Sequence, residues 1–461
     1  MRRVIYTVGT LGLLTSAVHG LQLDISNDDS IKQTASTVAY GLLKYYSGNV
    51  TGDTPGNLPD PYFWWEAGAM FGTLIDYWFY TGDDTYNDIT IQAMLHQAGD
   101  DADFMPTNQT KTEGNDDQGF WAMAAMSAAE NNFPNPPSDQ PQWLALAQAV
   151  FNEYVSRWDP ETCGGGVRWQ IFTFNNGFNY KNSISNGCFF NIASRLARYT
   201  GNQTYADWAE KIWDWMEEVQ FIDAAFNVVD GAGVEQNCTV QSPEQWTYNT
   251  GIFLHGAAVL YNFTNGSDVW KQRTQGLATR ATELFFQDGV VYEQACEPSS
   301  QCNNDQQSFK GYLMRWFTAA SQVASFTFDT LMPLVQSSAV AAATQCSGSP
   351  PADQYKGDAG TACGFKWANT TGFDGLAGVG EQMSALSALQ YSLVKKVDTF
   401  KGPVSANTGG TSVGNVNAGA ADESKIPVLP PITLTQRVAA GFITTAALLG
   451  VVGGSVFVMR E

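Results

Sequence analysis

Histidine is the residue type that this sequence has least of. Only three histidines occur among 461 residues: His19, His96 and His255. His19 lies in the expected leader, which leaves two histidines. That number argues against a histidine-rich zinc site and against a Ser-His-Asp triad. The sequence therefore predicts no metal site and no histidine-based nucleophile, and it indicates no cofactor. His96 and His255 are assigned structural roles.

Positive charge is also scarce. The chain has 24 Lys and Arg residues against 45 Asp and Glu residues, a net charge of −21 with a pI near 4.4. A phosphate-binding surface needs the opposite sign, so nucleic acid is excluded as a partner.

Aromatic residues, in contrast, are abundant. The 14 tryptophans exceed what a core usually needs, and exposed Trp and Tyr side chains are common platforms for sugar rings.

Residues 1–20 are typical of a secretory signal. Arg2 and Arg3 form a basic start, the apolar run Val4–Leu14 follows, and small residues precede the expected cleavage point. Seven Asn-X-Ser/Thr sequons fit the same route, and each is a candidate glycosylation site. They begin at Asn49, Asn108, Asn202, Asn237, Asn262, Asn265 and Asn369.

Seven cysteines lie downstream of this leader. An oxidising compartment favours disulfides, and the odd number leaves one cysteine over. The pairs Cys296–Cys302 and Cys346–Cys363 are close enough in sequence to form local bridges. The complete pairing, which also involves Cys163, Cys188 and Cys238, stays open.

Between positions 30 and 394 the sequence is dominated by helical periodicity. In the first such stretch, apolar residues recur at Ile31, Ala35, Val38 and Leu42. Twelve stretches of this kind are expected to be helices: 30–46, 64–80, 84–98, 116–130, 140–157, 183–199, 203–220, 245–262, 267–285, 305–323, 327–343 and 376–394.

The helices are expected to pair as hairpins. The motifs Tyr80-Thr81-Gly82-Asp83 and Tyr199-Thr200-Gly201-Asn202 each place a glycine at the end of one helix and a polar cap before the next. Six hairpins closing into a double ring, an all-α (α/α)6 barrel, best match twelve helices in one domain over residues 21–400. Two unrelated helical bundles are the alternative, although no linker-like composition divides the helical region.

The composition changes after residue 400. Residues 401–437 are rich in Gly, Ser, Ala, Thr and Pro, which predicts a disordered stalk. The tail 438–461 contains an apolar run, 438–458, that is long enough to span a bilayer. Small residues near 417–419, a spacer and this run resemble a GPI-attachment signal, in which case the tail is removed. A retained transmembrane helix is the alternative.

The densest ionisable chemistry lies in residues 113–130, EGNDDQGFWAMAAMSAAE. Asp116 and Asp117 are adjacent where a loop enters a helix, so both side chains can face one cavity. Cleavage of a glycosidic bond generally uses two carboxyl groups, one as acid and one as nucleophile or base. A helix N-terminus favours an ionised carboxylate, and repulsion between neighbours raises the pKa of the other. Simple helix capping by Asn115 or Asp116 is the alternative interpretation.

Ten further residues near predicted helix ends would suit a sugar-binding cleft. They supply amides, cations and aromatic faces at the end of a barrel where its loops gather. These substrate-binding candidates are Trp65, Asn115, Arg168, Trp169, Gln170, Asn182, Tyr248, Asn249, Asp305 and Lys310. Packing or capping is the alternative for each of them taken singly.

Several longer motifs resemble glycoside hydrolase family 76, in particular its fungal GPI-anchored cell-wall group. The similarity extends over residues 22–395, and Gly119 departs from it at a position where a residue such as Ala is expected. The matching motifs are EGNDDQGFWAMAAMSAAE at 113–130, GGGVRWQI at 164–171, YKNSISNGCFFNIASRLARYTGN at 180–202, WTYNTGIFLHGAAVLYN at 246–262 and NNDQQSFKGYLMRW at 303–316.

The resemblance implies an (α/α)6 barrel and a retaining mechanism on α-1,6-linked mannose, with Asp116 as nucleophile and Asp117 as acid/base. For the fungal group it further implies an endo-acting mannosidase or transglycosylase at the cell surface. Such an enzyme would cut α-1,6-mannan or the mannose core of a GPI anchor and pass the glycoprotein to wall glucan. Membrane attachment through a GPI anchor and a monomeric state are expected.

Two alternatives to this function stay open. A non-catalytic mannan-binding or wall-scaffolding protein could use the same barrel. Another carbohydrate enzyme with an (α/α)6 barrel could act on a different linkage. The sequence also leaves hydrolysis and transfer undecided, because that outcome depends on whether water or a sugar reaches the covalent intermediate.

Overall fold

The structure is a computed structural model, and it describes residues 20–109, 111–368, 372–396 and 402–420 together with a few positions between 438 and 449. The chain divides into two units after Ala420. The predictions for the signal peptide and for the stalk beyond residue 420 lie outside the described residues, as does most of the apolar tail. Among the helices that are described, none combines the length and hydropathy needed to cross a membrane.

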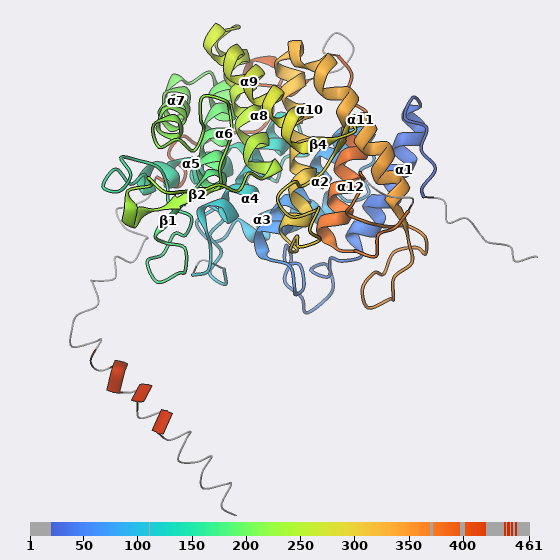
Figure 1. Cartoon of the computed structure of the whole chain (residues 1–461), viewed down its shortest axis with the longest axis horizontal. Helices are drawn as coiled ribbons and strands as arrows, with labels where there is room; N and C mark the ends of the chain where they lie inside the picture. The colour runs from blue at the N-terminus through green and yellow to red at the C-terminus, as the bar shows by residue number, and fades with distance from the viewer. Residues whose placement is uncertain are drawn as a thin grey trace, which may run out of the picture. The chain divides into compact units, whose positions relative to one another are not determined.

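The described residues contain twelve α-helices (Figure 1), each within a few residues of a predicted one. They are α1 Asp28–Leu43, α2 Trp64–Thr81, α3 Asn87–Gln97, α4 Asn115–Glu130, α5 Trp143–Arg157, α6 Ser183–Thr200, α7 Gln203–Glu218, α8 Thr247–Phe263, α9 Asp268–Phe285, α10 Gln306–Val323, α11 Phe328–Gln345 and α12 Val379–Tyr391.

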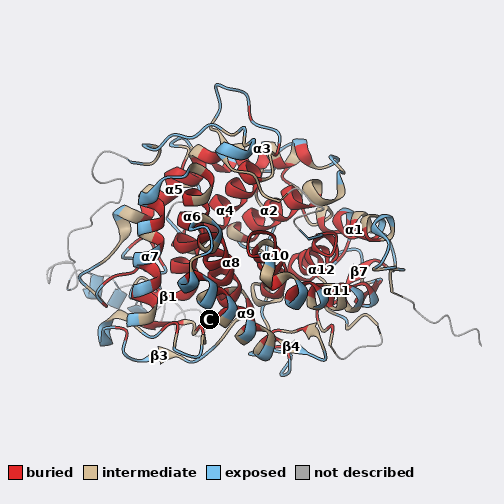
Figure 2. Cartoon of the chain, turned by 90° about the horizontal axis from the view of Figure 1, so that it is seen from above, coloured by how far each residue is buried: buried red, intermediate tan, exposed pale blue. Residues whose placement is uncertain are grey.

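The helices form two concentric rings. Each even-numbered helix contacts the next one, from α2 through α4, α6, α8 and α10 to α12, and α12 closes the ring on α2. The odd-numbered helices pack outside this ring, and Figure 2 shows the inner helices almost wholly buried while the outer ones keep an exposed side. The predicted (α/α)6 barrel of six hairpins is therefore confirmed.

Burial explains which helices lie inside. The inner helix α4 carries Ala, Met, Phe and Trp on all sides, and such a helix needs neighbours all round. The outer helix α7 instead buries one stripe that includes Tyr205, Ala209, Ile212 and Met216. The predicted hairpin turns are also present, since Gly82 and Gly201 end α2 and α6 in the left-handed conformation with φ of 79° and 73°.

Three short strands, which the sequence did not predict, lie beside the N-terminal end of α6. Strands β1 (Tyr180–Asn182), β2 (Gly231–Gly233) and β3 (Gln241–Ser242) form an antiparallel sheet in that order. Asn182 pairs with Gly231, and Gly231 pairs with Ser242. Two further pairs complete the strands: β4 (Phe286–Gln287) with β5 (Val290–Val291), and β6 (Cys346–Gly348) with β7 (Ala362–Cys363).

Three disulfides hold the loops between these helices. The two expected local bridges, Cys296–Cys302 and Cys346–Cys363, are both present. The third joins Cys163 to Cys238 across 75 residues and leaves Cys188 as the free, buried thiol. The long-range bridge ties the loop after α5 to the segment after β2, so it braces the side of the barrel that carries β1.

Residues 402–420 differ from the sequence prediction, because they dock onto the barrel instead of forming a disordered stalk. Their anchors lie on α4, α5, α6 and the turn after α4, and the prediction of disorder is wrong for this segment. Hydrogen bonds join Val404 to Glu130 and Arg198, Gly409 and Thr411 to Asn132, Thr411 also to Asn135, Ser412 to Leu144, Asn415 to Gln148, and Val416 and Ala418 to Asn152.

Removing this docked segment should destabilise the barrel. A chain that ends at residue 401 should have an unfolding free energy about 2 kcal/mol lower than one that ends at Ala420. Each lost hydrogen bond contributes ~1 kcal/mol, and most of that loss is offset because the segment no longer has to be ordered. Thermal unfolding of the two chains measures the difference. Equal stability would show that the docking contributes nothing.

Candidate active site

The first turns of the inner helices meet around one cleft of about 430 Å³. This volume falls in the usual range for small-molecule sites. The helices α2, α4, α8 and α10 contribute residues at or next to their N-terminal ends, and the sheet β1–β3, which includes Asn182 just before α6, adds one wall. The lining residues are Trp65, Asp116, Asp117, Phe120, Trp169, Tyr180, Asn182, Asp230, Ser242, Glu244, Trp246, Tyr248, Asn303, Asp305, Gln306 and Phe309.

Asp116 and Asp117 both open into this cleft. The other 14 of the 16 residues of α4 are all buried. The Gly114 amide donates to Oδ2 of Asp117 at 2.6 Å, and the Asp117 amide donates to Oδ1 of Asp116 at 3.2 Å. The free amides at the helix start thus partly offset the negative charge of both side chains.

The two carboxyl groups behave as a coupled pair. Burial raises the pKa of Asp117 to about 7, although the hydrogen bond from the Gly114 amide opposes the shift. Burial and the charge of Asp117 together raise the pKa of Asp116 well above its usual value. Both carboxyl groups therefore hold a proton more tightly than an exposed aspartate does, and their titration belongs to the two residues jointly.

Three more carboxyl groups line the cleft. Asp230 accepts a hydrogen bond from the Tyr180 hydroxyl at 2.8 Å, and burial raises its pKa. Burial also raises the pKa of Asp305, while Glu244 accepts from the Ser242 hydroxyl. No Lys, Arg or His is among the lining residues, so the cleft is strongly negative. The described residues contain no group of His, Cys, Asp and Glu arranged to hold a metal ion.

Aromatic rings form much of the remaining surface. Tyr248 and Phe309 stack with their ring centres 3.8 Å apart and their planes 7° from parallel. Trp65 lies against Phe120 with ring centres 4.8 Å apart, and Trp169 is 37% exposed. Flat apolar faces beside carboxylates are the combination that suits sugar rings, whose hydroxyls need hydrogen-bond acceptors.

Half of the predicted substrate-binding residues lie in the cleft with the two aspartates. Trp65, Trp169, Asn182, Tyr248 and Asp305 line it, and the Asn182 side chain hydrogen-bonds to Asp116. The other five candidates lie behind the cleft wall and hold it in place.

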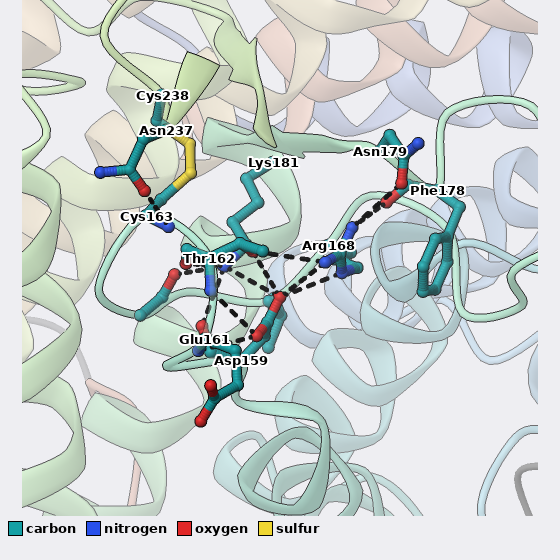
Figure 3. A network of polar contacts seen from close by, with 12 residues as sticks. Asp159, Glu161, Thr162, Cys163, Arg168, Phe178, Asn179, Lys181, Asn237 and Cys238 are labelled. Atoms are coloured by element: carbon teal, nitrogen blue, oxygen red, sulfur yellow. Dashed lines mark hydrogen bonds and ion pairs between the residues drawn. A yellow bond between two sulfur atoms is a disulfide. The ribbon is translucent and has the colours of Figure 1, made fainter. Parts of the chain in front are cut away.

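Arg168 points into a polar network outside the cleft (Figure 3). Its guanidinium forms an ion pair with Asp159 at 2.9 Å and lies over the Phe178 ring. The fully buried Lys181 ammonium contacts the same aspartate at 3.3 Å and donates to three backbone carbonyls of the 159–165 loop. Arg168 is not among the residues that line the cleft, and the network fixes the loop that carries Trp169.

Lys310, Asn249, Gln170 and Asn115 are buried as well. The Lys310 ammonium pairs with Glu297 at 3.1 Å and donates to a backbone carbonyl. Asn249 lies buried in the first turn of α8, and Gln170 accepts from the Asn175 side chain. Asn115 donates to the Arg168 carbonyl at 2.8 Å. None of the four is among the residues that line the cleft, although the Asn249 side chain hydrogen-bonds to the lining residue Asp230.

Nine lining residues were absent from the predicted set. Asp230, Ser242 and Glu244 belong to the segment between α7 and α8, where strands of two or three residues give no periodic signal. The inner helices are every second helix of the chain. Aromatic and amide residues at their starts could have been found by listing the first residues of those helices. The nine are Phe120, Tyr180, Asp230, Ser242, Glu244, Trp246, Asn303, Gln306 and Phe309.

Gly119 is required by close packing beneath the aspartates. A Cβ at this position would lie 2.5 Å from the Tyr154 hydroxyl and 2.7 Å from the Cys188 sulfur. The helix continues without interruption through Gly119, so the departure from the expected Ala leaves the helix geometry intact. The glycine lets α5 and α6 approach α4 directly behind the two carboxyl groups.

Comparison with known proteins gives consistent matches over nearly the whole chain. A family model described as glycosyl hydrolase family 76 matches residues 30–407. The mannan endo-1,6-alpha-mannosidase DCW1 of Saccharomyces cerevisiae is 48% identical over 448 residues, which cover 96% of each chain. The crystal structure of Dfg5 from Chaetomium thermophilum in complex with glucosamine has a TM-score of 0.81 at 46% identity, and the match covers 87% of this chain and 98% of that one.

A more distant structure matches in fold. It is an inactive variant of the α-1,6-mannanase GH76A of Salegentibacter sp. in complex with α-1,6-mannotriose, in which two consecutive aspartates are replaced by asparagine. Its TM-score is 0.61 at 18% identity, and the match covers 79% of this chain and 99% of that one.

Neutralising Asp117 should stabilise the folded chain at high pH only. Its folded-state pKa of about 7 lies above the ordinary value of 3.8, so the associated stability is complete below about pH 4 and is lost as the pH rises through about 7. Asp117→Asn should therefore raise the unfolding free energy near pH 8, by at most ~4 kcal/mol at ~1.4 kcal/mol per pKa unit. Thermal unfolding at about pH 4 and about pH 8 tests this, and a variant less stable than wild type near pH 8 contradicts it.

Proposed function

The chain belongs to glycosyl hydrolase family 76, and from that premise we propose that it cleaves or transfers α-1,6-linked mannose with the Asp116–Asp117 pair. It is a glycoside hydrolase. The observation that carries the assignment of the site is the opening of two adjacent carboxyl groups into an aromatic-lined cleft.

The proposed reaction proceeds in two steps. The ionised Asp116 attacks the anomeric carbon of a mannose and forms a covalent mannosyl-enzyme, while the glycosidic bond breaks. Asp117 gives its proton to the leaving sugar oxygen. In the second step Asp117 takes a proton from water or from a sugar hydroxyl, whose oxygen then displaces Asp116 from the anomeric carbon. The first step needs an ionised Asp116 and a protonated Asp117. Hydrogen bonds from two backbone amides and from the Asn182 side chain favour the ionised form of Asp116, against burial and the charge of Asp117, which raise its pKa.

Names of the relatives support the substrate. DCW1 and DFG5 of Saccharomyces cerevisiae, the second of which is 43% identical to this chain over 449 residues, are both named mannan endo-1,6-alpha-mannosidases. These names favour catalysis over a non-catalytic scaffold. Within the proposal, Trp65, Trp169, Asn182, Tyr248 and Asp305 contact the sugars, because they line the cleft with the aspartate pair.

The donor is proposed to include the mannose core of a GPI anchor. The Dfg5 structure was obtained in complex with glucosamine, an amino sugar. Five carboxyl groups and no cation line the cleft here, which favours a sugar with an ammonium group. Transfer to wall glucan, GPI anchoring at the cell surface and a monomeric state complete the proposal.

Substitution of each aspartate should separate the two roles. Mannosyl fluoride needs little acid assistance, so Asp117→Asn should still form the covalent adduct and accumulate it, whereas Asp116→Asn should form none. Both variants should lose at least ~100-fold in turnover of an α-1,6-mannoside. Mass spectrometry of the intact protein and product analysis with and without a glucan acceptor provide the measurements.

Asp84→Asn serves as the control, because Asp84 is an exposed acid outside the cleft. Its turnover should equal that of the wild type. An adduct on Asp116→Asn would remove the nucleophile assignment. Wild-type protein that converts no α-1,6-mannoside, with or without acceptor, would refute the substrate.

A further inference from the structure

The side of α5 that faces α4 holds the first turn of α4 from behind. Three residues do this, Glu153, Tyr154 and Arg157, and we call them the α5 clamp. We propose that Arg157 is a positioning residue, which acts through Asn115 and Gln118 to fix Asp116 and Asp117 in their reactive arrangement. The proposal rests on the function proposed above and concerns residues outside the cleft.

One nitrogen of Arg157 binds both residues that flank the aspartate pair. Its Nη1 donates to Oδ1 of Asn115 at 2.9 Å and to Oε1 of Gln118 at 2.6 Å. Asn115 immediately precedes Asp116, and Gln118 immediately follows Asp117. A shift of this guanidinium would therefore displace the backbone on both sides of the pair.

The guanidinium is itself held in one place. Its Nη2 forms an ion pair with Oε2 of Glu153, one helical turn earlier on α5. The side-chain amide of Gln118 donates to the same oxygen at 2.7 Å. Arg157, Glu153 and Gln118 thus close a small ring of charge-assisted hydrogen bonds. The side chains of Arg157 and Glu153 are only 7% and 9% exposed, so water competes little for these bonds.

The clamp also reaches the cleft wall through Asn115. The Tyr154 hydroxyl donates to the Asn115 carbonyl, while the Asn115 amide donates to the carbonyl of Trp169 at 2.8 Å. Trp169 lines the cleft. Asn115 therefore connects α5, the start of α4 and one wall of the site, which explains why it is buried and makes no contact with the cleft.

Charge gives Arg157 a second effect on the same turn. Glu113, just before α4, is buried, and neither of its carboxyl oxygens has a hydrogen-bond partner among the described residues. Burial and the charges of Asp117, Asp103 and Glu153 raise the pKa of Glu113, and Arg157 is the cation that opposes this shift. Without Arg157, several acids would lie together behind the catalytic pair with no compensating cation.

Loss of the clamp should lower the rate of reaction more than substrate binding. Arg157 does not line the cleft, and Trp65, Tyr248 and Asp305, which are proposed to contact the sugar, lie on or beside the other helices α2, α8 and α10. The two carboxyl groups, however, must lie within a fraction of an ångström of their working positions, and a displacement of ~1 Å can cost about 100-fold in rate. The expected signature is therefore a reduced kcat with little change in KM.

The test uses the full chain with Arg157→Met, Arg157→Lys and Glu153→Gln. On an α-1,6-mannoside we expect Arg157→Met to lose roughly 10- to 100-fold in kcat with KM within about threefold of wild type. Arg157→Lys keeps the charge and should recover part of the rate, because an ammonium lacks the planar fork of the guanidinium. Glu153→Gln keeps the shape of the clamp and stays measurable if Arg157→Met does not fold.

Arg195→Met is the matched control. The Arg195 side chain is also buried, 4% exposed, and is paired with Glu130 at 2.7 Å, but this pair lies at the opposite end of α4. This variant should lose stability and keep its kcat. Equal losses of kcat in Arg157→Met and Arg195→Met would overturn the proposal, as would folded Arg157 variants with a kcat within twofold of wild type.

A crystal structure of Arg157→Lys supplies a readout that needs no substrate. We expect the carboxyl groups of Asp116 and Asp117 to move relative to the rest of the cleft. If wild-type protein does not convert the mannoside but the carboxyl groups move, the positioning role stands and the proposed substrate fails. Carboxyl groups in unchanged positions would refute the positioning role whatever the activity.

Discussion

Two neighbouring carboxyl groups in one poorly solvated cleft repel each other, and the rest of the structure depends on how this repulsion is contained. Placement at the start of an inner helix supplies free amides, of which Gly114 donates to Asp117 and Asp117 to Asp116. Burial, together with the remaining repulsion, raises the pKa of both carboxyl groups. Two carboxyl groups held in this way are the combination that the proposed cleavage of a glycosidic bond requires.

The ring of inner helices gives this pair its surroundings and could be predicted to a large extent from the sequence. Apolar residues on all sides of stretches such as 115–130 require an inner position, and glycines such as Gly82 and Gly201 mark where a hairpin turns. The docking of residues 402–420 could not be predicted. Their low-complexity composition is typical of disorder, and the side chains that bind them, such as Asn132 and Asn152, lie far away in sequence.

The cleft was less predictable than the fold, for a physical reason. A polar residue near the start of a helix can face the cleft or bond to the backbone behind it, and the sequence does not distinguish the two. Asn182 and Asp305 face the cleft, whereas Arg168 and Lys310 point away from it and satisfy buried acids and carbonyl groups. The position of the adjacent aspartates was predictable. They lie in a first helical turn between a loop and a buried segment, so both side chains can point in one direction only, toward the cleft.

The outer helix α5 connects features at both ends of the barrel. One side carries Leu144, Gln148 and Asn152, spaced four residues apart, and these bind the docked segment 402–420. The side that faces α4 carries Arg157 and its partner Glu153, which hold the turn with the two aspartates. The docked segment therefore packs on the outside of the same helix whose inner side contacts the turn with the two aspartates.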